Sequence, residues 1–531
     1  MNETMTSPHH GQALMHEAAS QRDAALHRHD SSDLDTSPPP HAESGVRSFF
    51  ARKGVFITGG SGLVGKVLIE KILRDCPEVG RIFVLLRPAR KKRCDVHQRL
   101  QTDILDSHCF DYLRGIWPGF RSRCVAVQGD VGRPLLGMCQ VDYDTVCAKC
   151  SIVFHCAATV KFNESLETAF RINVDGITHM YELCRRLRTL DVVVHVSTAY
   201  VNASNHSTTL IPEALVPITF DHVRLRQEVA RMSPELLRAE TGRILKESGN
   251  WPNTYCLTKC IGEHVLAAHL RQAALPCVIL RPSIVTCALQ TPQPGWIDSL
   301  LGPSGLVLAV AVGALHVAPG DANLLVDFVP VDIVVNAMIA CAWYRGVGAG
   351  CGKVQSSREG GEATVVHVGT SSRNPVQWRF MWEAMPPYYQ RHPIQAGKKR
   401  GPVFFQWARS RLGYLALHYL THIFPAVMID SHKALTGKSA STLRQARRLR
   451  EALEAFSFFT THEWVFDTAT LSEVRARLPA ADKTLCNCDV ESFSWDVYMT
   501  VWAHGMKVFL LDEGPVLCAR PRSQPLQRSR L

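Results

Sequence analysis

The sequence predicts an α/β protein with a doubly wound parallel sheet, followed by a mainly helical C-terminal domain. From Gly54 onward, short apolar runs alternate with amphipathic helical stretches, and the runs are continuously apolar. Strands of this kind, separated by helices, are typical of a parallel sheet covered on both faces. After about residue 385, aromatic residues and leucines recur at helical spacing, which favours a second, helical unit.

Each predicted strand is a short run of β-branched and other apolar residues. A helix from about Gly62 to Arg74 follows the first strand. The predicted strands are Val55–Ile57, Ile82–Leu86, Val125–Val127, Ile152–Phe154, Val192–Val196, Cys277–Leu280 and Val365–Val368.

Changes in composition along the chain predict four segments. Residues 1–48 are rich in Ser, His, Asp and Pro, lack apolar periodicity, and are expected to be a disordered arm. Residues 49–384 form the sheet domain, with insertions that bind substrate, and residues 385–515 form the helical domain. Residues 516–531 are expected to be a flexible tail.

Overall composition excludes several classes of protein. The chain has 531 residues, of which 46% are hydrophobic and 20% charged, which excludes a wholly disordered or collagen-like chain. Its net charge of +11 favours anionic partners. Most of the 18 cysteines lie in apolar runs, and Cys147 and Cys150 form the sole Cys-x-x-Cys pair. We therefore expect reduced thiols, no metal site and no nucleic-acid partner.

A glycine-rich loop between the first strand and its helix predicts dinucleotide binding. Gly59 permits the tight turn, Gly62 lets the backbone approach a pyrophosphate, and Gly65 lets the helix pack closely on the strand. The helix N-terminus then presents free N–H groups to the phosphates. The predicted cofactor-binding loop comprises Thr58, Gly59, Gly60, Ser61, Gly62, Leu63, Val64 and Gly65.

The end of the second strand favours NADPH over NADH. An NAD site usually has Asp or Glu there, whereas this chain has Arg87, followed by the basic residues Arg90 to Arg93. An arginine suits a 2′-phosphate because its planar fork bonds phosphate bidentately. For residues 91–93 a solvated basic loop is an equal alternative. Asp130, after the third strand, is either an adenine contact or a turn residue.

Tyr255 and Lys259 are spaced four residues apart, so a helix would place them on one face. An adjacent ammonium is expected to lower the pKa of the Tyr255 phenol, which makes it a better proton donor to a carbonyl that receives hydride. Thr198, or less readily Ser197, follows the fifth strand and is expected to donate a hydrogen bond to the developing oxyanion. Asn173 either steadies the site or fills a polar position.

Two apolar segments raise the question of a membrane. Gly305–Ala318 is too short to span a bilayer, and Leu412–Ile429 carries His418, His422 and Pro425. A buried core helix or an interfacial surface helix fits both segments better. Basic segments near Arg444 and Arg520 either contact anionic lipid or are solvated.

These motifs together resemble an extended short-chain dehydrogenase/reductase with a Rossmann-like sheet, and more narrowly the alcohol-forming fatty acyl-CoA reductases. The resemblance runs from about Gly54 to Gly514. Beyond the motifs above it includes residues 153–158, 196–202, 280–285, 329–332 and 367–375, and in the helical part residues 424–437, 458–467 and 495–498.

The resemblance implies NADPH as cofactor, a long-chain acyl-CoA substrate and a primary fatty alcohol product. It also implies that Val131, Ala157, Ala158 and Pro282 contact the cofactor, with Tyr255 and Lys259. The expected reaction has two hydride steps through a bound aldehyde, and residues 299–318 with helices of the second unit would line the alkyl channel. The alternatives are a sterol or sugar-nucleotide dehydrogenase, an aldehyde-forming reductase, and a non-catalytic NADPH-binding scaffold on a membrane.

The chain ends in Ser529-Arg530-Leu531, which is similar to the Ser-Lys-Leu peroxisomal address. We expect recognition by a peroxisomal import receptor and a location in peroxisomes or the related glycosomes, with possible peripheral contact with a membrane. Cytoplasm is the alternative.

Overall fold

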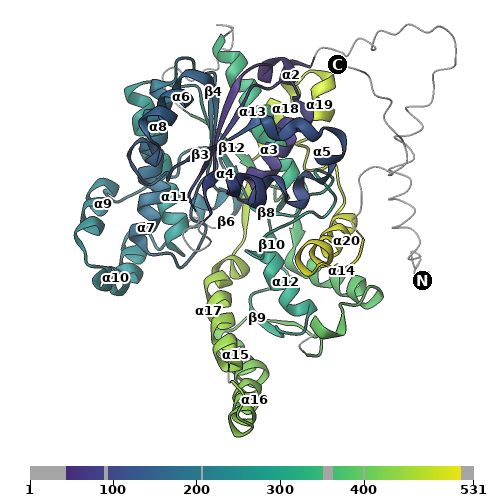
Figure 1. Cartoon of the computed structure of the whole chain (residues 1–531). Coiled ribbons are helices and arrows are strands. Elements are labelled where there is room, and N and C mark those ends of the chain that lie inside the picture. The colour runs from purple at the N-terminus through teal and green to yellow at the C-terminus, as the bar shows by residue number, and fades with distance from the viewer. Residues whose placement is uncertain are drawn as a thin grey trace, which may run out of the picture.

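The computed structural model describes residues 44–88, 94–204, 207–350, 363–398, 401–439 and 441–515. Its centre is a seven-stranded parallel sheet in the order β12-β7-β5-β4-β1-β2-β3 (Figure 1). The predicted strands are all present, with ends within two residues of those expected. The sheet strands are β1 (Gly54–Thr58), β2 (Ile82–Leu86), β3 (Cys124–Gln128), β4 (Cys150–His155), β5 (Val192–Val196), β7 (Cys277–Pro282) and β12 (Thr364–Val368).

Helices cover both faces of the sheet, as a doubly wound fold requires. Val55 and Ile57 of β1 pack in a core cluster with α3 (Leu63–Asp75) and α13 (Val331–Gly350). Phe56 points to the other face, into a cluster with α6 (Gln140–Lys149), α8 (Gly176–Arg186) and α11 (Thr254–Gln272). Because both faces are buried, the strands are largely apolar, which is why the sequence pattern predicted them.

The remaining elements connect the sheet strands or follow them. The helices are α2 (Gly45–Phe50), α4 (Val96–Arg99), α5 (Asp111–Ile116), α7 (Leu166–Phe170), α9 (His222–Arg231), α10 (Pro234–Glu247), α12 (Pro303–Ala311), α14 (Trp378–Arg391), α15 (Arg411–His418), α16 (Phe424–Leu435), α17 (Thr442–Thr461), α18 (Ala469–Arg477), α19 (Ala480–Leu485) and α20 (Trp495–Gly505). The π-helical turns η5 (Arg171–Asp175) and η8 (Tyr419–Ile423) join neighbouring helices. The short strands are β6 (Ser207–Ile211), β8 (Ile284–Thr286), β9 (Val317–Pro319), β10 (Leu325–Val326), β11 (Phe328–Pro330), β13 (Val376–Gln377), β14 (Gln406–Ala408) and β15 (Trp464–Phe466).

The C-terminal part is mainly helical and packs closely against the sheet domain. Strand β15 pairs in parallel with β6, and α20 lies against α14. The Trp502 ring of α20 packs edge-on to Phe328 of β11, with ring centroids 5.3 Å apart. The domain boundary that the sequence predicts between residues 384 and 385 falls inside α14. Residues of α14 and α20 share one core cluster, so buried contacts cross this boundary.

The first described residues lie inside the segment expected to be a disordered arm. Ser44 caps α2, and the backbone N–H of Val46 donates to Asp482 Oδ2 over 3.0 Å. Val46, Phe49 and Phe50 are buried, so the folded part begins before residue 48. Residues 1–43, the basic residues Arg90 to Arg93 and the tail 516–531, with Ser529-Arg530-Leu531, lie outside the described residues.

The two apolar segments have different structures. Residues 305–318 lie in α12 and β9 and are largely buried, so this segment is part of the core. Residues 411–435 form the continuous helical segment α15-η8-α16, which projects from the body beside α17 (Figure 1). Its length and composition would suffice to cross a membrane, and only 22% of its most apolar window is buried. The core alternative is therefore wrong for Leu412–Ile429.

Candidate active site

The glycine loop connects β1 to α3 at the carboxyl edge of the sheet. Gly59 has a φ of +75°, and a Cβ atom there would lie 2.7 Å from the backbone N of Ala157. At Gly65 a Cβ would lie 2.3 Å from the carbonyl oxygen of Gly59, so close packing of helix on strand requires glycine. Gly62 has nothing closer than 3.4 Å, is exposed, and precedes α3 without a side-chain cap. An open backbone and uncapped N–H groups fit a pyrophosphate.

Thr58 joins this loop to the next strand of the sheet. Its hydroxyl lies 2.9 Å from His155 Nδ1 and accepts a hydrogen bond of 3.1 Å from the backbone N–H of Ala157. The segment with Ala157 and Ala158 is thereby held against Gly59. Burial lowers the pKa of His155 to about 3, so this imidazole is neutral at physiological pH. It orients the loop and is no source of protons.

The predicted adenine-side residues lie at the ends of β2 and β3. Arg87 is exposed just after β2, and its carbonyl oxygen accepts a hydrogen bond from the Arg99 guanidinium. Asp130 caps a turn through the backbone N–H of Gly132 (3.0 Å) and faces Arg171 at 3.4 Å. The turn role of Asp130 is therefore present in the structure. The side chain of Val131 is buried after β3.

Tyr255 lies in the first turn of α11, where Asn253 caps the helix by accepting from the N–H of Cys256 at 2.9 Å. The side chain of Thr198, which follows β5, lies close enough to the Tyr255 hydroxyl to lower its pKa, against the larger effect of burial, which raises it. Thr198 also contacts the carbonyl oxygen of Pro282, 3.5 Å away at the end of β7. Two hydroxyl groups from separate elements thus meet at the carboxyl edge of the sheet, where open α/β sheets bind their ligands.

Lys259 follows Tyr255 by one helical turn but does not pair with it. Its Nζ donates to the carbonyl oxygen of Val196 at 2.8 Å. Burial raises the pKa of Tyr255 above its ordinary value, with the hydroxyl of Thr198 opposing the shift. The expected lowering of the Tyr255 pKa by Lys259 is therefore wrong, since the ammonium reaches β5 instead. Tyr255 remains a protonated phenol at neutral pH, which is the form that donates a proton.

Burial also lowers the pKa of Lys259 to about 8, with Glu263 opposing the shift. Glu263 forms a fully buried bidentate ion pair with Arg281 of β7. Arg281 in turn lies 3.2 Å from His367 Nε2 on β12. These buried contacts of Arg281 with Glu263 and His367 were not predicted from the sequence. Glu263 nevertheless lies on the same face of α11 as Tyr255 and Lys259, one turn further along.

Ser197 and Asn173 also lie close to the site. The buried Ser197 hydroxyl has no hydrogen-bond partner within the described part of the chain. Asn173 accepts from the N–H of Thr159 at 3.0 Å and donates to Thr258 Oγ1 at 3.0 Å. It therefore steadies the backbone after β4 against α11, which is the first of the two roles considered for it.

Comparisons with known proteins show the family of the chain. Two family models, both described as male sterility protein, match the chain, one for NAD binding over residues 57–338 and one over residues 421–513. Fatty acyl-CoA reductase 1 of Mus musculus is 32% identical over 471 residues, which cover 88% of this chain and 86% of that protein. The human fatty acyl-CoA reductase 1 has the same identity and coverage, and human fatty acyl-CoA reductase 2 is 28% identical over 470 residues, 88% of this chain and 87% of that protein.

The chain belongs to the fatty acyl-CoA reductase family. It is an oxidoreductase with an NAD(P)-binding domain.

Solved structures agree on the fold. The reductase domain of a non-ribosomal peptide synthetase from Mycobacterium tuberculosis is 18% identical with a TM-score of 0.54, covering 89% of this chain and 94% of that domain. The terminal R domain of the myxalamid PKS-NRPS pathway is 17% identical with a TM-score of 0.53, and the match covers 92% of this chain and 97% of that domain.

In this reductase the helical part supplies an apolar wall beside Tyr255. The ring of Phe162 lies 6.1 Å from that of Tyr255, and 5.3 and 5.2 Å from those of Phe456 and Phe459 in α17. A Cβ atom on Gly302, just before α12, would lie 3.9 Å from Phe456. Sequence analysis missed Phe162, since nothing local marks a contact between residues so far apart in the chain.

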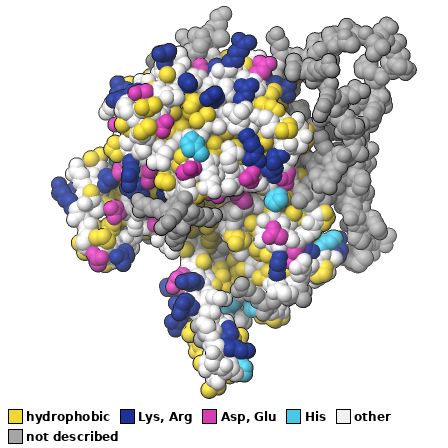
Figure 2. All heavy atoms as spheres, in the orientation of Figure 1, with side chains coloured by type: hydrophobic (Ala, Val, Ile, Leu, Met, Phe, Trp, Pro, Cys, Tyr) yellow, Lys and Arg dark blue, Asp and Glu magenta, His cyan; other side chains and the backbone are white. Residues whose placement is uncertain are grey.

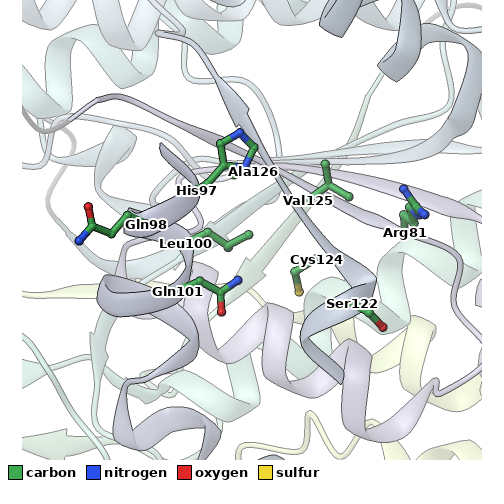
Figure 3. Close-up of a pocket in the computed structure, with 9 residues that line it drawn as sticks. All are labelled: Arg81, His97, Gln98, Leu100, Gln101, Ser122, Cys124, Val125 and Ala126. Carbon is green, nitrogen blue, oxygen red and sulfur yellow. The ribbon is translucent and has the colours of Figure 1, made fainter. Parts of the chain in front are cut away.

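A second unexpected contact joins the cofactor loop to the segment before α12. Lys66, in the first turn of α3, forms an ion pair of 2.8 Å with Asp298. A separate surface pocket of about 460 Å³ lies between α4 and the edge strand β3, lined among others by Arg81, His97 and Cys124 (Figure 3). Arg81 and Cys124 stand at the amino ends of β2 and β3, so this pocket is at the opposite end of the strands from Tyr255.

Proposed function

We propose that this reductase converts long-chain fatty acyl-CoA and NADPH into a primary fatty alcohol and free CoA, in two successive hydride transfers through a bound aldehyde. The observation that carries the proposal is the proximity of the Tyr255 and Thr198 hydroxyls, at the sheet edge that bears the glycine loop. The names of the relatives support the acyl-CoA substrate.

The residues at the sheet edge fit a bound dinucleotide. The N-terminus of α3 and the exposed backbone of Gly62 would hold the pyrophosphate. Arg87, exposed at the end of β2 where an NAD site has a carboxylate, supports NADPH through its 2′-phosphate. When bound, the reduced nicotinamide supplies the hydride.

The protein's residues handle the substrate oxygen and its proton. Thr198 and Tyr255 donate hydrogen bonds to the thioester carbonyl oxygen, which becomes negatively charged as the carbon gains hydride. Tyr255 protonates that oxygen, and the resulting hemithioacetal breaks its carbon–sulfur bond as its hydroxyl proton passes to sulfur, which releases the CoA thiol and an aldehyde. After Tyr255 has regained a proton from solvent and a second NADPH has replaced the spent cofactor, the aldehyde oxygen accepts the same hydrogen bonds. It then takes a second proton from Tyr255 as its carbon gains hydride, which gives the alcohol.

The apolar wall beside Tyr255 supports an alkyl chain as the rest of the substrate. Phe162, Phe456 and Phe459 are carbon surfaces adjacent to the phenol, and Gly302 faces Phe456. A sugar nucleotide would instead need polar partners around its hydroxyl groups. This wall supports the proposal that residues 299–318 and helices of the second unit line the alkyl channel.

The test is incubation of the purified protein with palmitoyl-CoA and NADPH, with alcohol, aldehyde and free thiol measured separately. The proposal predicts hexadecanol, with two NADPH oxidised for each thiol released. One NADPH for each thiol with accumulated hexadecanal would assign an aldehyde-forming reductase. Absence of thiol release would favour a sterol or sugar-nucleotide dehydrogenase or a scaffold. Replacement of Arg87 by Ala should raise KM for NADPH while leaving that for NADH nearly unchanged.

We further propose that the alcohols supply ether lipids or waxes and that the protein acts in peroxisomes or glycosomes, delivered by an import receptor that binds Ser529-Arg530-Leu531. A fluorescent protein fused to the N-terminus should locate to these organelles. The same fusion at the C-terminus masks the terminal tripeptide and should remain in the cytosol. Equal distribution of both fusions would contradict the address.

A further inference from the structure

In the helical segment α15-η8-α16, polar side chains face the protein and large apolar side chains face outward, the reverse of an ordinary surface helix. Its inward stripe, at intervals of four residues, consists of the buried Tyr414, His418, His422 and Ala426. Its outward surface carries large apolar side chains, of which Leu412 is 82% exposed, Leu420 63% and Met428 58%. We call the outward surface the apolar ridge; it comprises Leu412, Leu415, Tyr419, Leu420, Phe424, Val427, Met428, Ile429 and Leu435.

The ridge stands on the part of the molecule that projects furthest from the sheet, and Figure 2 shows apolar and basic side chains together there. Soluble proteins rarely expose contiguous apolar surface on this scale, so the ridge marks a contact site. The helix that carries it is anchored at its start, where α15 contacts β9 and β14, and at its end, where α16 contacts α17.

Basic residues surround the ridge. Residues 411–450 contain seven Lys and Arg but a single acidic residue, Asp430. The Asp430 carboxylate accepts from the backbone N–H groups of Thr442 and Leu443 at 3.0 and 2.9 Å, so it caps α17 and ties its first turn to α16. The exposed Arg444, Arg447 and Arg448 follow in the next turns of α17, and the described part of the chain offers these three no ion pair.

We propose that the apolar ridge and these three arginines form a membrane-docking surface that lies in the plane of an anionic bilayer. The ridge would enter the boundary between headgroups and acyl chains, and the guanidinium groups would bond lipid phosphates. Charge complementarity commits this surface to anionic lipid, because the three exposed arginines, which have no ion pair among the described residues, suit a negatively charged surface.

Shallow docking fits the surface better than a membrane span. Because α17 packs along α16, insertion of α16 across the bilayer would carry Arg444, Arg447 and Arg448 into hydrocarbon. Charged side chains at that depth are strongly disfavoured. Docking in the plane keeps them at the headgroups while the ridge is still removed from water.

The test is flotation of the full-length protein with vesicles of phosphatidylcholine alone or with about 30% phosphatidylserine. A double variant, Leu420→Asp with Met428→Asp, should reduce binding to the anionic vesicles at least tenfold. The triple variant Arg444→Glu, Arg447→Glu, Arg448→Glu should reduce binding to anionic vesicles about fivefold for each arginine, with little change on the neutral ones.

Matched controls place the same change on exposed apolar residues elsewhere. Val141 in α6 is 75% exposed and Leu236 in α10 is 50% exposed, and aspartate at either should leave flotation at the wild-type level. Circular dichroism and thermal unfolding check that each variant is folded, which is expected because all the replaced side chains are exposed.

Four results would overturn the proposal. The first is wild-type flotation by the folded Leu420→Asp, Met428→Asp variant. The second is failure of the wild-type protein to float with either vesicle. The third is a wild-type dimer that this double variant dissociates, since a second copy would then cover the ridge. The fourth is retention of the protein in cell membranes after an alkaline carbonate wash, which would indicate a span.

Discussion

At the scale of single residues, burial brings the pKa of Lys259 close to physiological pH, so its charge depends on pH in the range where the enzyme is assayed. Burial lowers its pKa from 10.5 to about 8, while Glu263 opposes the shift. Below about pH 8 it is an ammonium, whose positive charge at the carboxyl edge of the sheet favours the negative charge that develops on the substrate oxygen as hydride arrives. Above that pH the ammonium loses its proton and this stabilisation disappears.

We therefore predict that kcat falls as the pH rises through about 8. In the Lys259→Met variant kcat should be at least tenfold lower at pH 7, and its pH profile should lack this descending limb. The measurement is the steady-state rate with palmitoyl-CoA between about pH 6 and pH 10, at saturating NADPH. A wild-type rate that stays constant across this range would contradict a role for the ammonium.

Residues marked by a local sequence pattern could be predicted, whereas contacts that depend on packing between distant elements could not. Tyr255, Lys259 and Thr198 could be predicted because helix spacing and strand ends are local properties. The ion pair of Arg281 with Glu263 and the contact of Phe162 with Tyr255 depend on how elements pack. The pKa of Tyr255 was predicted in the wrong direction, because sequence spacing does not reveal that Lys259 Nζ bonds to Val196.

At the scale of elements, the junction of β1 and α3 separates two roles of glycine. At Gly65 a Cβ atom would lie 2.3 Å from a backbone oxygen, whereas at Gly62 the nearest atom is 3.4 Å away. The first glycine is required for the helix to pack on the strand. The second is required where the backbone approaches a phosphate.

The Gly65→Ala variant should lose roughly 1–3 kcal/mol of unfolding free energy through overpacking, together with at least tenfold in affinity for NADPH. Gly62→Ala is the matched control: it should retain wild-type stability while binding NADPH more weakly. Thermal unfolding and fluorescence titration with NADPH provide the two measurements. Equal stability of the two variants would show that the packing role is assigned incorrectly.

Element positions were predicted well where burial on both faces leaves a continuous apolar run, as in β1 and β2. The short strands β6 and β15 were not predicted. They form a parallel pair between segments more than 250 residues apart, and three to five residues carry too little pattern to reveal it.

At the scale of the whole molecule, the C-terminal part completes the fold. Tyr498 of α20 donates to the carbonyl oxygen of Cys287 at 2.9 Å, and Trp502 packs against Phe328. The boundary suggested by composition near residue 385 is therefore crossed by buried contacts. Composition follows local propensity, whereas the extent of a folding unit depends on shared burial.

We predict that Trp502→Ala destabilises the protein by roughly 3–5 kcal/mol, and that urea unfolding followed by circular dichroism and by fluorescence remains a single coincident transition. A nearby half-buried replacement, Thr500→Ala, serves as control because among the described residues the Thr500 hydroxyl bonds to the carbonyl oxygen of Asp496 in its own helix. Two separate unfolding transitions, of which the substitution shifts only that of the C-terminal part, would contradict the claim that both parts form one folding unit.

The central claim is that the Tyr255 phenol, beside the Thr198 hydroxyl, protonates the carbonyl oxygen of the substrate. Its most direct test is single-turnover reduction of palmitoyl-CoA and of hexadecanal by Tyr255→Phe, with NADPH affinity measured separately. We predict a rate at least about 100-fold below wild type for both substrates, with the dissociation constant of NADPH nearly unchanged. Wild-type turnover by the folded variant would contradict the claim.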